Sequence, residues 1–336
     1  MTSVKELACV AGVIPTSGII KSDTADFLVD EIMPVQPSGE GEHLWLHIRK
    51  TGNNTDWVAR QLAVWANVKP MDVGYAGLKD RHGVTSQWYS IQLPGKADPN
   101  MAALKIEGVE VLQHKRHNRK LKRGTLAGNR FDMTVRELKG DTSELQARLV
   151  AVQQQGVPNY FGEQRFGHSM SNLPAAERMF NGERVKQHER SLYLSAARSW
   201  IFNQVLNQRV RANNWNTHVP GDVFMLDGRS ACFPDDKSAE IESRLAALEI
   251  HPTGPLWGGG ISMAQGDCLL LENNVARQFS SFCSGLEKVG MDQERRALRL
   301  RVKELQWQIA SDVLHISFAL PAGSYATMVL REIVSG

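Results

Sequence analysis

The chain has 336 residues, 42% of them hydrophobic, and this length usually exceeds what a single core organises, so we expect two domains. Its 39 Lys and Arg residues against 36 Asp and Glu residues give a net charge of only +3, which excludes a uniformly basic protein. No apolar run approaches the roughly 20 residues that span a bilayer, and no secretory signal pattern occurs, so we expect no membrane association and a cytoplasmic location.

Roughly the first 150 residues are expected to be strands mixed with a few helices. Alternating or apolar runs predict strands at 26–32, 44–49, 86–93 and 130–136. The alternation over 44–49 is typical of a half-buried strand, with Trp45 on its outer face. A helix capped by Asn54 or Thr55 is expected to run to about residue 67.

A glycine-bounded turn at 74–87 contains a single acidic residue, Asp80, between Lys79 and Arg81. We expect these two cations to hold the pKa of Asp80 low, while Gly77 and Gly83 let the backbone turn sharply and a substrate approach. A carboxylate that stays ionised suits nucleophilic or electrostatic work better than general-acid work. A solvated surface turn would carry the same residues, so the turn alone does not define a function.

A basic run covers residues 113–124, and no acidic residue occurs between Glu110 and Asp132. With Arg130 it carries seven Lys or Arg residues, and without them the chain would have 32 basic against 36 acidic residues. Segregated positive charge is typical of proteins that bind a phosphate backbone, so RNA or DNA binding is favoured. The alternatives are a solvated loop or a localisation signal. Both this run and the Asp80 turn are expected to precede strands.

Helices are expected to dominate from Asp141 onward. They are predicted at 141–155, 190–212 and 272–284, with a glycine-rich loop at 254–260. Residues 156–167 combine three glycines, a proline and three aromatic residues, which indicates a domain junction. Strands return at 298–303 and 314–320, so the end of the chain is similar in kind to its beginning. This order predicts a helical domain inserted into a mixed sheet.

The four cysteines, Cys9, Cys232, Cys268 and Cys283, are far apart and lack a C-x-x-C pair or a matching histidine spacing. Their spacing predicts neither a zinc site nor a disulfide framework. Glycine-rich loops of the P-loop and dinucleotide-binding types are also missing from the sequence. We therefore expect no metal and no nucleotide cofactor.

Four motifs taken together resemble the tRNA pseudouridine synthase D (TruD) family. In the family's order they are YAGLKDR at 75–81, GTLAGNRF at 124–131, NYFGEQRFG at 159–167 and LPAGSYAT at 320–327. The resemblance implies an isomerase that converts uridine to pseudouridine in tRNA, with uridine 13 of the D-arm as the usual target. It also implies no cofactor, no metal and no obligatory protein partner, because family members usually act as monomers.

The same resemblance implies an α+β fold. Residues 1–154 and 300–336 are expected to form a catalytic domain of pseudouridine synthase type with a mixed, mainly antiparallel sheet. Residues 155–299 are expected to form an inserted, largely helical domain of the TRUD type.

In the family, the aspartate that matches Asp80 is the nucleophile. An ionised carboxylate can add to the ribose C1′, add to C6 of the base, or assist formation of a glycal intermediate. The sequence leaves these three routes open, and it does not identify the group that abstracts the proton.

Five further residues are assigned to the substrate by the resemblance. Phe131 stands where other pseudouridine synthases carry an active-site tyrosine, so its ring can stack on the base but offers no hydroxyl. Asn129 is expected to hydrogen-bond the uracil edge, and Phe27 matches an aromatic residue that contacts the substrate. Tyr325 falls where many members have Phe and can cover the flipped nucleotide, and Lys21 is the expected basic partner of the aspartate. Without the motifs, Phe27 and Phe131 would be assigned to a strand core and Asn129 to a turn.

A uridine in folded tRNA must be extruded before its C1′ and C5 can be reached together, and a basic rim offsets part of that cost. Backbone phosphates are expected to contact Lys79, Arg81, His82, Lys115, Arg116, Arg119, Lys120 and Arg123. Such contacts contribute affinity and not the choice of base.

Two alternatives of other classes remain at this stage. One is a non-catalytic RNA-binding protein, such as a folding chaperone that uses only the basic run and the aromatic residues. The other is a hydrolase or glycosidase acting on RNA with a carboxylate pair, although Asp80 has no acidic partner nearby in the sequence.

Overall fold

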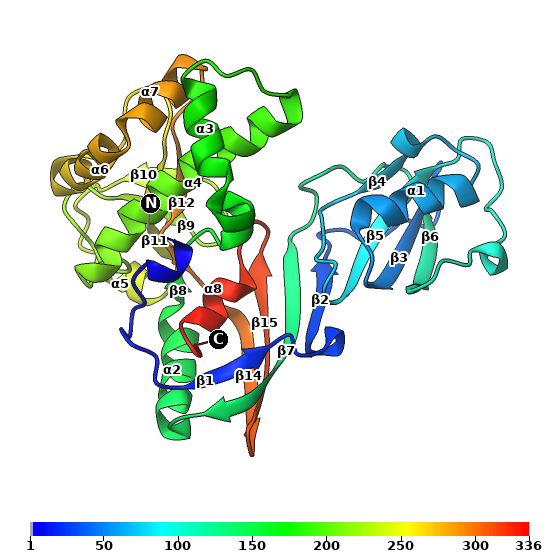
Figure 1. Cartoon of the computed structure of the whole chain (residues 1–336), viewed down its shortest axis with the longest axis horizontal. Helices are drawn as coiled ribbons and strands as arrows, with labels where there is room; N and C mark the ends of the chain where they lie inside the picture. Colours follow the sequence, from blue (N-terminus) through cyan, green and yellow to red (C-terminus); the bar gives the residue numbers. More distant parts are fainter. Residues whose placement is uncertain (1–2, 336) are drawn as a thin grey trace. The chain divides into compact units, whose positions relative to one another are not determined.

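The structure is a computed structural model that describes residues 3–335. The chain divides into two compact units, and each is drawn in Figure 1. Unit 1 comprises Met1–Thr16, Asp141–Val302 and Ser324–Ser335, and unit 2 comprises Ser17–Gly140 and Lys303–Gly323. These units differ from the predicted domains in that packing places 1–16, 141–154 and 324–335 in unit 1. The domain boundaries at 154 and 300 stay a prediction.

Unit 2 is built on a nine-stranded sheet in the order β14-β15-β7-β2-β5-β3-β6, with β1 paired to β7 and β4 to β5 (Figure 1). The strands are β1 (Ser17–Ile20), β2 (Phe27–Ile32), β3 (His43–Thr51), β4 (Val73–Tyr75), β5 (Val84–Gln92), β6 (Val109–His117), β7 (Gly128–Lys139), β14 (Lys303–Ala310) and β15 (Val313–Pro321). The β2–β5 pair is parallel and the other pairs are antiparallel. The predicted mixed, mainly antiparallel sheet is therefore confirmed.

Helix α1 (Thr55–Trp65) covers part of this sheet. Its buried Val58 and Leu62 pack with Leu46 and Ile48 of β3 and with residues of β5. The helix begins where the sequence predicted, after Asn54, and ends two residues earlier than expected. Short 3-10 helices η2 (Thr24–Asp26), η3 (Pro70–Asp72) and η4 (Met101–Ala103) lie in the connections.

The register of the central strands collects the predicted site residues on one face. Strand β2 pairs with β7 so that Val29 lies opposite Phe131 and Glu31 opposite Asn129. Directly opposed residues project to the same side of a sheet, and alternate residues of a strand do so as well. Phe27, Glu31, Asn129 and Phe131 therefore share one face.

Two expectations for unit 2 are wrong. The basic run was expected to precede the strand at 130–136 and no strand was predicted within it, but residues 113–117 form the second half of β6, an outer strand that pairs with β3. Trp45 was expected on an exposed strand face, but it is only 1% exposed. The rings of Trp88 and His117 cover it, with centroids 5.8 and 4.4 Å away.

Unit 1 is largely helical, as predicted. Its helices are α2 (Thr142–Gln155), α3 (Asn172–Phe180), α4 (Gln187–Arg211), α5 (Ile241–Ala246), α6 (Gly266–Gln278), α7 (Ser280–Lys288) and α8 (Ala326–Arg331), with 3-10 helices η1 (Val4–Glu6), η5 (Glu163–Phe166) and η6 (His168–Met170). The 25-residue α4 carries much of the core through buried residues such as Trp200, Ile201 and Phe202.

A second sheet in unit 1 was not predicted. Its four strands are β9 (Val223–Leu226), β10 (Cys232–Pro234), β11 (Ile250–Leu256) and β12 (Glu294–Ala297), in the order β10-β9-β11-β12. A separate two-stranded pair joins β8 (Val157–Pro158) to β13 (Arg299–Leu300). The predicted loop at 254–260 thus begins inside β11, and the predicted helix at 272–284 is two helices, α6 and α7.

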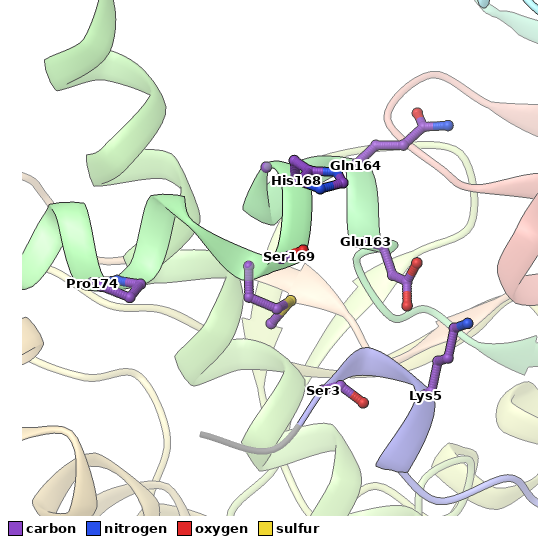
Figure 2. A pocket seen from close by; sticks show the side chains of 9 residues that line it. Ser3, Lys5, Glu163, Gln164, His168, Ser169 and Pro174 are labelled. Atoms are coloured by element: carbon purple, nitrogen blue, oxygen red, sulfur yellow. The ribbon is translucent and has the colours of Figure 1, made fainter.

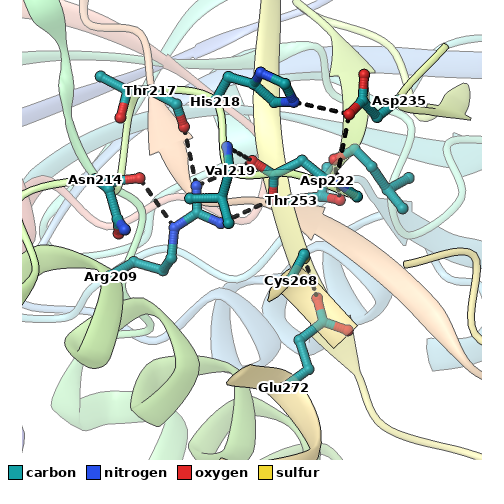
Figure 3. A network of polar contacts seen from close by, with 12 residues as sticks. Arg209, Asn214, Thr217, His218, Val219, Asp222, Asp235, Thr253, Cys268 and Glu272 are labelled. Atoms are coloured by element: carbon teal, nitrogen blue, oxygen red, sulfur yellow. Dashed lines mark hydrogen bonds and ion pairs between the residues drawn. The ribbon is translucent and has the colours of Figure 1, made fainter. Parts of the chain in front are cut away.

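The core of unit 1 contains a buried polar network (Figure 3). The Arg209 guanidinium donates to both carboxylate oxygens of Asp222, at 2.8 and 3.1 Å, and these side chains are 1% and 0% exposed. Arg209 also donates to the carbonyl oxygens of Asn214 and Thr217, at 2.9 and 3.0 Å. These bonds join the end of α4 to the loop that precedes β9.

The first and last described segments of the chain meet in unit 1. The Val10 N–H donates to Glu332 Oε2 at 2.8 Å, and the Ser335 N–H donates to the Thr16 carbonyl at 2.9 Å. Residues far apart in the sequence therefore complete the same unit.

Candidate active site

Asp80 lies in the loop between β4 and β5, in unit 2. Three hydrogen bonds attach this loop to the sheet and to α1: Lys79 N–H to Thr55 Oγ1 at 3.0 Å, Gln87 Nε2 to the Gly77 carbonyl at 3.0 Å, and Lys50 Nζ to the Asp80 carbonyl at 3.0 Å. The backbone that carries the carboxylate is thus held by three elements, α1, β3 and β5.

Of the two glycines predicted to shape the turn, Gly83 is the one with a steric requirement. A Cβ atom at Gly83 would lie 2.6 Å from the Phe27 carbonyl oxygen, so a larger residue would push the loop away from β2. At Gly77 the nearest neighbouring atom would be 3.7 Å away, which is an ordinary contact. Close approach to the sheet, and not to a ligand, accounts for the glycine at 83.

The Asp80 carboxylate accepts two hydrogen bonds. Its Oδ2 lies 2.7 Å from Lys21 Nζ, and its Oδ1 accepts from the His82 N–H at 2.9 Å. Burial raises the pKa of Asp80, but the bonds from Lys21 and His82 outweigh this effect, so the pKa lies below its ordinary value. The low pKa was expected from Lys79 and Arg81, whereas the structure gives Lys21 and a backbone N–H as its causes.

The Asp80 and Lys21 side chains remain 24% and 25% exposed. Lys21 follows β1 with φ of 61°, in the left-handed region that residues other than glycine seldom adopt. Its ammonium lies 3.9 Å from the centroid of the Phe27 ring, a cation–π contact. The Phe27 and Phe131 centroids are 6.2 Å apart. Carboxylate, ammonium and two aromatic rings therefore form one continuous cluster.

Phe27 and Phe131 are only 5% and 7% exposed. Phe131 also packs on Phe318 of β15, with centroids 5.6 Å apart. Each ring can therefore present only a small part of its surface to a base.

Lys79 has a different place from the one predicted. Its side chain is 4% exposed, with Nζ 3.4 Å from Glu31 Oε1 and within hydrogen-bonding reach of Asn129 Oδ1. This burial does not fit the predicted phosphate contact, because the ammonium faces the sheet and not solvent. Burial lowers the pKa of Lys79 and raises that of Glu31, and in each residue the partner's charge opposes the effect of burial.

Glu31 and Lys50 are site residues that sequence reasoning missed. Glu31 is completely buried at its side chain and also accepts from the Trp88 N–H at 2.9 Å. Lys50 is 1% exposed, and burial lowers its pKa to about 8. Both lie in strands whose residues alternate between buried and exposed positions, and both are at buried positions. Glu31 continues the buried series of Phe27 and Val29, and Lys50 continues that of Ile48. A charged residue at a position where the alternation predicts burial was the signal in the sequence that could have identified both residues.

The predicted phosphate contacts divide into two groups. Arg81, His82, Lys115, Arg119 and Arg123 are exposed. Arg116 is directed inward, because its Nε lies 2.6 Å from Asp98 Oδ1 and its Nη2 donates to the Lys96 carbonyl at 2.8 Å. Lys120 is partly buried and donates to the Met71 carbonyl. The inward bonds of Arg116 hold the 93–98 connection, which does not fit a phosphate contact.

Tyr325 belongs to unit 1, whereas the other predicted substrate residues belong to unit 2. It lies just before α8, and its hydroxyl accepts from Arg165 Nε at 3.0 Å. Its ring meets Phe161 edge to face, with centroids 6.2 Å apart.

A separate pocket of about 950 Å³ lies in unit 1 around η5 and η6 (Figure 2). Its lining includes Lys5 and Glu163, so its charge is mixed. Ser169 and Met170 beside it have φ of 51° and 63°, the left-handed region that residues other than glycine seldom adopt. The sequence assigned none of these residues to the site.

Within residues 3–335, no group of three His, Cys, Asp or Glu side chains is arranged to hold a metal ion. No helix in this part of the chain is long and apolar enough to cross a membrane.

Comparison with known proteins identifies the family. The family model of tRNA pseudouridine synthase D (TruD) matches residues 7–176 and 174–333. The tRNA pseudouridine synthase D of Methylococcus capsulatus is 52% identical over 327 residues, covering 96% of this chain and 92% of that protein. The protein of the same name from Hydrogenovibrio crunogenus is 46% identical over 334 residues, covering 98% of this chain and 96% of that protein.

A crystal structure of a Methanosarcina mazei protein assigned to TruD has the same fold. Its TM-score is 0.72 at 22% sequence identity, over 99% of this chain and 96% of that chain. Because the family model and the relatives extend over nearly the whole sequence, the chain belongs to the tRNA pseudouridine synthase D (TruD) family.

Proposed function

We propose that the protein is a tRNA pseudouridine synthase that isomerises uridine 13 of the D-arm, with Asp80 as the nucleophile. One observation carries the proposal: the Asp80 carboxylate is held ionised by Lys21 and the His82 N–H, yet it stays 24% exposed beside Phe27. Membership of the TruD family supports the same activity.

The isomerisation breaks the bond between ribose C1′ and uracil N1, turns the freed base, and joins C1′ to C5. The C5 atom then loses its proton and N1 gains one, so the product is an isomer of uridine. A carboxylate that adds to C1′ or C6, or that assists a glycal intermediate, must be unprotonated. The low pKa of Asp80 meets that requirement at neutral pH. The three routes remain alternatives within the proposal.

Lys79 and Glu31 contribute by positioning Asn129. Because Lys79 Nζ donates to Asn129 Oδ1, the amide oxygen is occupied and the amide NH₂ is left to donate. An NH₂ group is the part of the amide that binds a uracil carbonyl. Glu31 keeps the Lys79 ammonium charged in this buried position.

Affinity for tRNA is assigned to the exposed cations, Arg81, Lys115, Arg119 and Arg123. We propose a monomer that acts in the cytoplasm on tRNA, without a cofactor, metal or protein partner, as in the family.

The test is pseudouridine mapping on unmodified tRNA transcripts with the wild-type protein, Asp80→Asn and Asp30→Asn. Asp30 is an exposed carboxylate that alternates with Glu31 onto the other face of β2, so it is a matched control. We expect conversion at one D-arm uridine by the wild type and Asp30→Asn, and none by Asp80→Asn with tRNA binding retained.

Two other results would favour the alternative functions. Tight tRNA binding without conversion on any tRNA would support a non-catalytic RNA-binding protein. Release of free uracil would support a glycosidase, because isomerisation keeps the base attached.

A further inference from the structure

Unit 1 contains a second pocket, of about 470 Å³. The sequence did not predict it, and it has no part in the proposed mechanism. Its wall combines side chains from α4, the junction segment around η5, and β12. Three of its lining residues are arginines, Arg165, Arg198 and Arg296, and one is a carboxylate, Glu294. We name it the arginine pocket.

The charge of the arginine pocket is not balanced by its own lining. Glu294 is paired with Arg198 Nη1 at 3.1 Å, and its side chain is 63% exposed. The lining therefore carries two more positive than negative charges. The pocket of Figure 2, in contrast, has both Lys5 and Glu163 on its wall.

Two of the guanidinium groups contact the same aromatic ring. Arg296 lies 4.1 Å and Arg165 lies 5.3 Å from the centroid of Phe161. Burial lowers the pKa of Arg296 to about 10, and the neighbouring Arg165 charge acts in the same direction. Two like charges that line the same cavity repel each other, and an anion bound in that cavity would relieve the repulsion.

The arginines are also fixed in place before any ligand arrives. Arg165 donates from Nε to the Tyr325 hydroxyl at 3.0 Å and from Nη1 to Ser195 Oγ at 2.9 Å. Arg296 Nη2 donates to Asn159 Oδ1 at 2.6 Å. The acceptors of these three bonds are uncharged, so the bonds orient the guanidinium groups and supply no counter-charge.

Arg198 supplies a further observation. Its Nη2 donates to the carbonyls of Leu256 and Asp292, at 2.8 and 2.7 Å, but its buried Nε has no hydrogen-bond partner. A buried N–H that lacks an acceptor is costly and uncommon. An acceptor oxygen from a ligand in the pocket would satisfy it.

We propose that the arginine pocket binds one phosphate group of the RNA backbone. Guanidinium groups match phosphate oxygens in shape, charge and donor geometry, and prearranged donors lose little freedom on binding. The choice of RNA as the source of the phosphate rests on the proposed function, because the backbone of that substrate is a chain of phosphodiester groups. The pocket adds to unit 1 an RNA contact separate from the exposed cations of unit 2.

The test measures tRNA binding at several KCl concentrations for the wild type, Arg165→Gln, Arg165→Lys and Arg178→Gln. Arg178 is a matched control, since it is an exposed arginine of unit 1 that pairs with Glu183 outside the pocket. For Arg165→Gln we expect about 10-fold weaker binding at low salt, and a slope of log affinity against log salt reduced by about 0.7 to 0.9, the loss for one phosphate contact. Arg165→Lys should keep most of the slope, and Arg178→Gln should match the wild type.

Three results would overturn the proposal. One is an unchanged slope for Arg165→Gln. Another is an equal change for Arg178→Gln. The third combines two measurements: inorganic phosphate stabilises the wild type but not Arg165→Gln in thermal melts, while the salt slope of tRNA binding is the same for both proteins. That result would assign the pocket to a small phosphate ligand.

Thermal melting of each variant without ligand separates a folding defect from a binding defect, and Arg165→Lys is the variant that retains the charge if Arg165→Gln does not fold. The wild-type mapping experiment is independent of this test. A wild type that forms no pseudouridine contradicts the proposed function, whereas an unchanged salt slope in an active enzyme contradicts only the phosphate site.

Discussion

The Asp80–Lys21 pair of unit 2 and the Asp222–Arg209 pair of unit 1 have similar lengths, 2.7 and 2.8 Å, but opposite surroundings. The unit 2 side chains are 24% and 25% exposed, whereas the unit 1 side chains are 0% and 1% exposed. Arg209 also satisfies two backbone carbonyls, and Asp222 also accepts from the Val219 N–H at 2.8 Å. The enclosed pair serves the fold, whereas the partly open pair leaves a carboxylate accessible to a ligand.

The two pairs also differ in the free energy of unfolding that is lost when one partner is removed. Removing one partner of a buried pair leaves an uncompensated charge in the interior, at a cost of about 3–5 kcal/mol. Exposed pairs typically contribute about 0–1 kcal/mol. Mutations at the two pairs should therefore change different measured quantities.

The largest expected effect on stability comes from Asp222→Asn. We expect it to lower the free energy of unfolding by about 3–5 kcal/mol, because Arg209 would be left buried without its counter-charge. Urea unfolding followed by circular dichroism would measure this, with Asp80→Asn beside it. Asp80→Asn should change stability by about 1 kcal/mol or less while abolishing activity. Similar stability losses in both variants would contradict the comparison.

Glu31→Gln should have an intermediate effect on both quantities. It removes the counter-charge of buried Lys79. Because a buried lysine can lose its proton, whereas Arg209 stays charged, we expect a smaller stability loss than for Asp222→Asn, of about 1–3 kcal/mol. We also expect kcat to fall about 10-fold with little change in KM, because the Asn129 amide would lose its fixed orientation. Single-turnover kinetics and urea unfolding would measure the two effects.

The double variant Glu31→Gln/Lys79→Met provides the control for this prediction. It removes both buried charges, so stability should recover while activity stays low. Recovery of activity together with stability would show that Glu31 acts only through the fold.

Lys21→Met tests the cause of the low pKa at Asp80. Activity requires the ionised carboxylate, so it falls as pH decreases through the pKa of Asp80. The hydrogen bond from Lys21 lowers that pKa, so its removal should move the acidic limb of the kcat/KM profile to higher pH. The stability contributed by the pair is present above the ordinary pKa of Asp and is lost as pH falls through the lowered value. An acidic limb that does not move would assign the low pKa to the His82 N–H.

The smallest effect is expected from Lys115→Ala with Arg119→Ala. Both side chains are exposed, so stability should stay within about 0.5 kcal/mol of the wild type. The slope of log tRNA affinity against log salt should fall by about 1.4 to 1.8, the loss for two phosphate contacts. Filter binding would measure the slope, and Arg49→Ala with Arg60→Ala is a control pair of the same total charge. An unchanged slope would show that Lys115 and Arg119 are not part of the RNA-binding surface.

The sequence predicted the strands that bear the site better than it predicted the directions of individual charged side chains. Phe27, Asn129 and Phe131 were assigned from motifs, and the pairing of β2 with β7 places them on one face. Lys79 and Arg81 are neighbours of Asp80 in one turn, yet one side chain is buried and the other is exposed. Spacing within an irregular loop does not determine which side chain points inward, whereas a strand register does.

Missed elements have equally specific causes. Strand β6 was missed because hydrogen bonds to β3, and not an apolar pattern, hold its basic second half. Strand β11 contains Pro252, Gly254 and Pro255, residues that usually argue against a strand. Strands β9, β10 and β12 have only three or four residues each, too few for a periodicity to be recognised.

The meeting of the two ends of the chain in unit 1 has a consequence for synthesis. The ribosome synthesises the chain from its N-terminus. The hydrogen bonds of Val10 and Thr16 therefore cannot form until Glu332 and Ser335 have been made. The sheet of unit 2 is also incomplete until then, because β7 pairs with β15, which is synthesised late. Neither unit can be completed during translation of the first 300 residues, so the growing chain leaves open the strand edge of β7 and the apolar surface that the last residues cover.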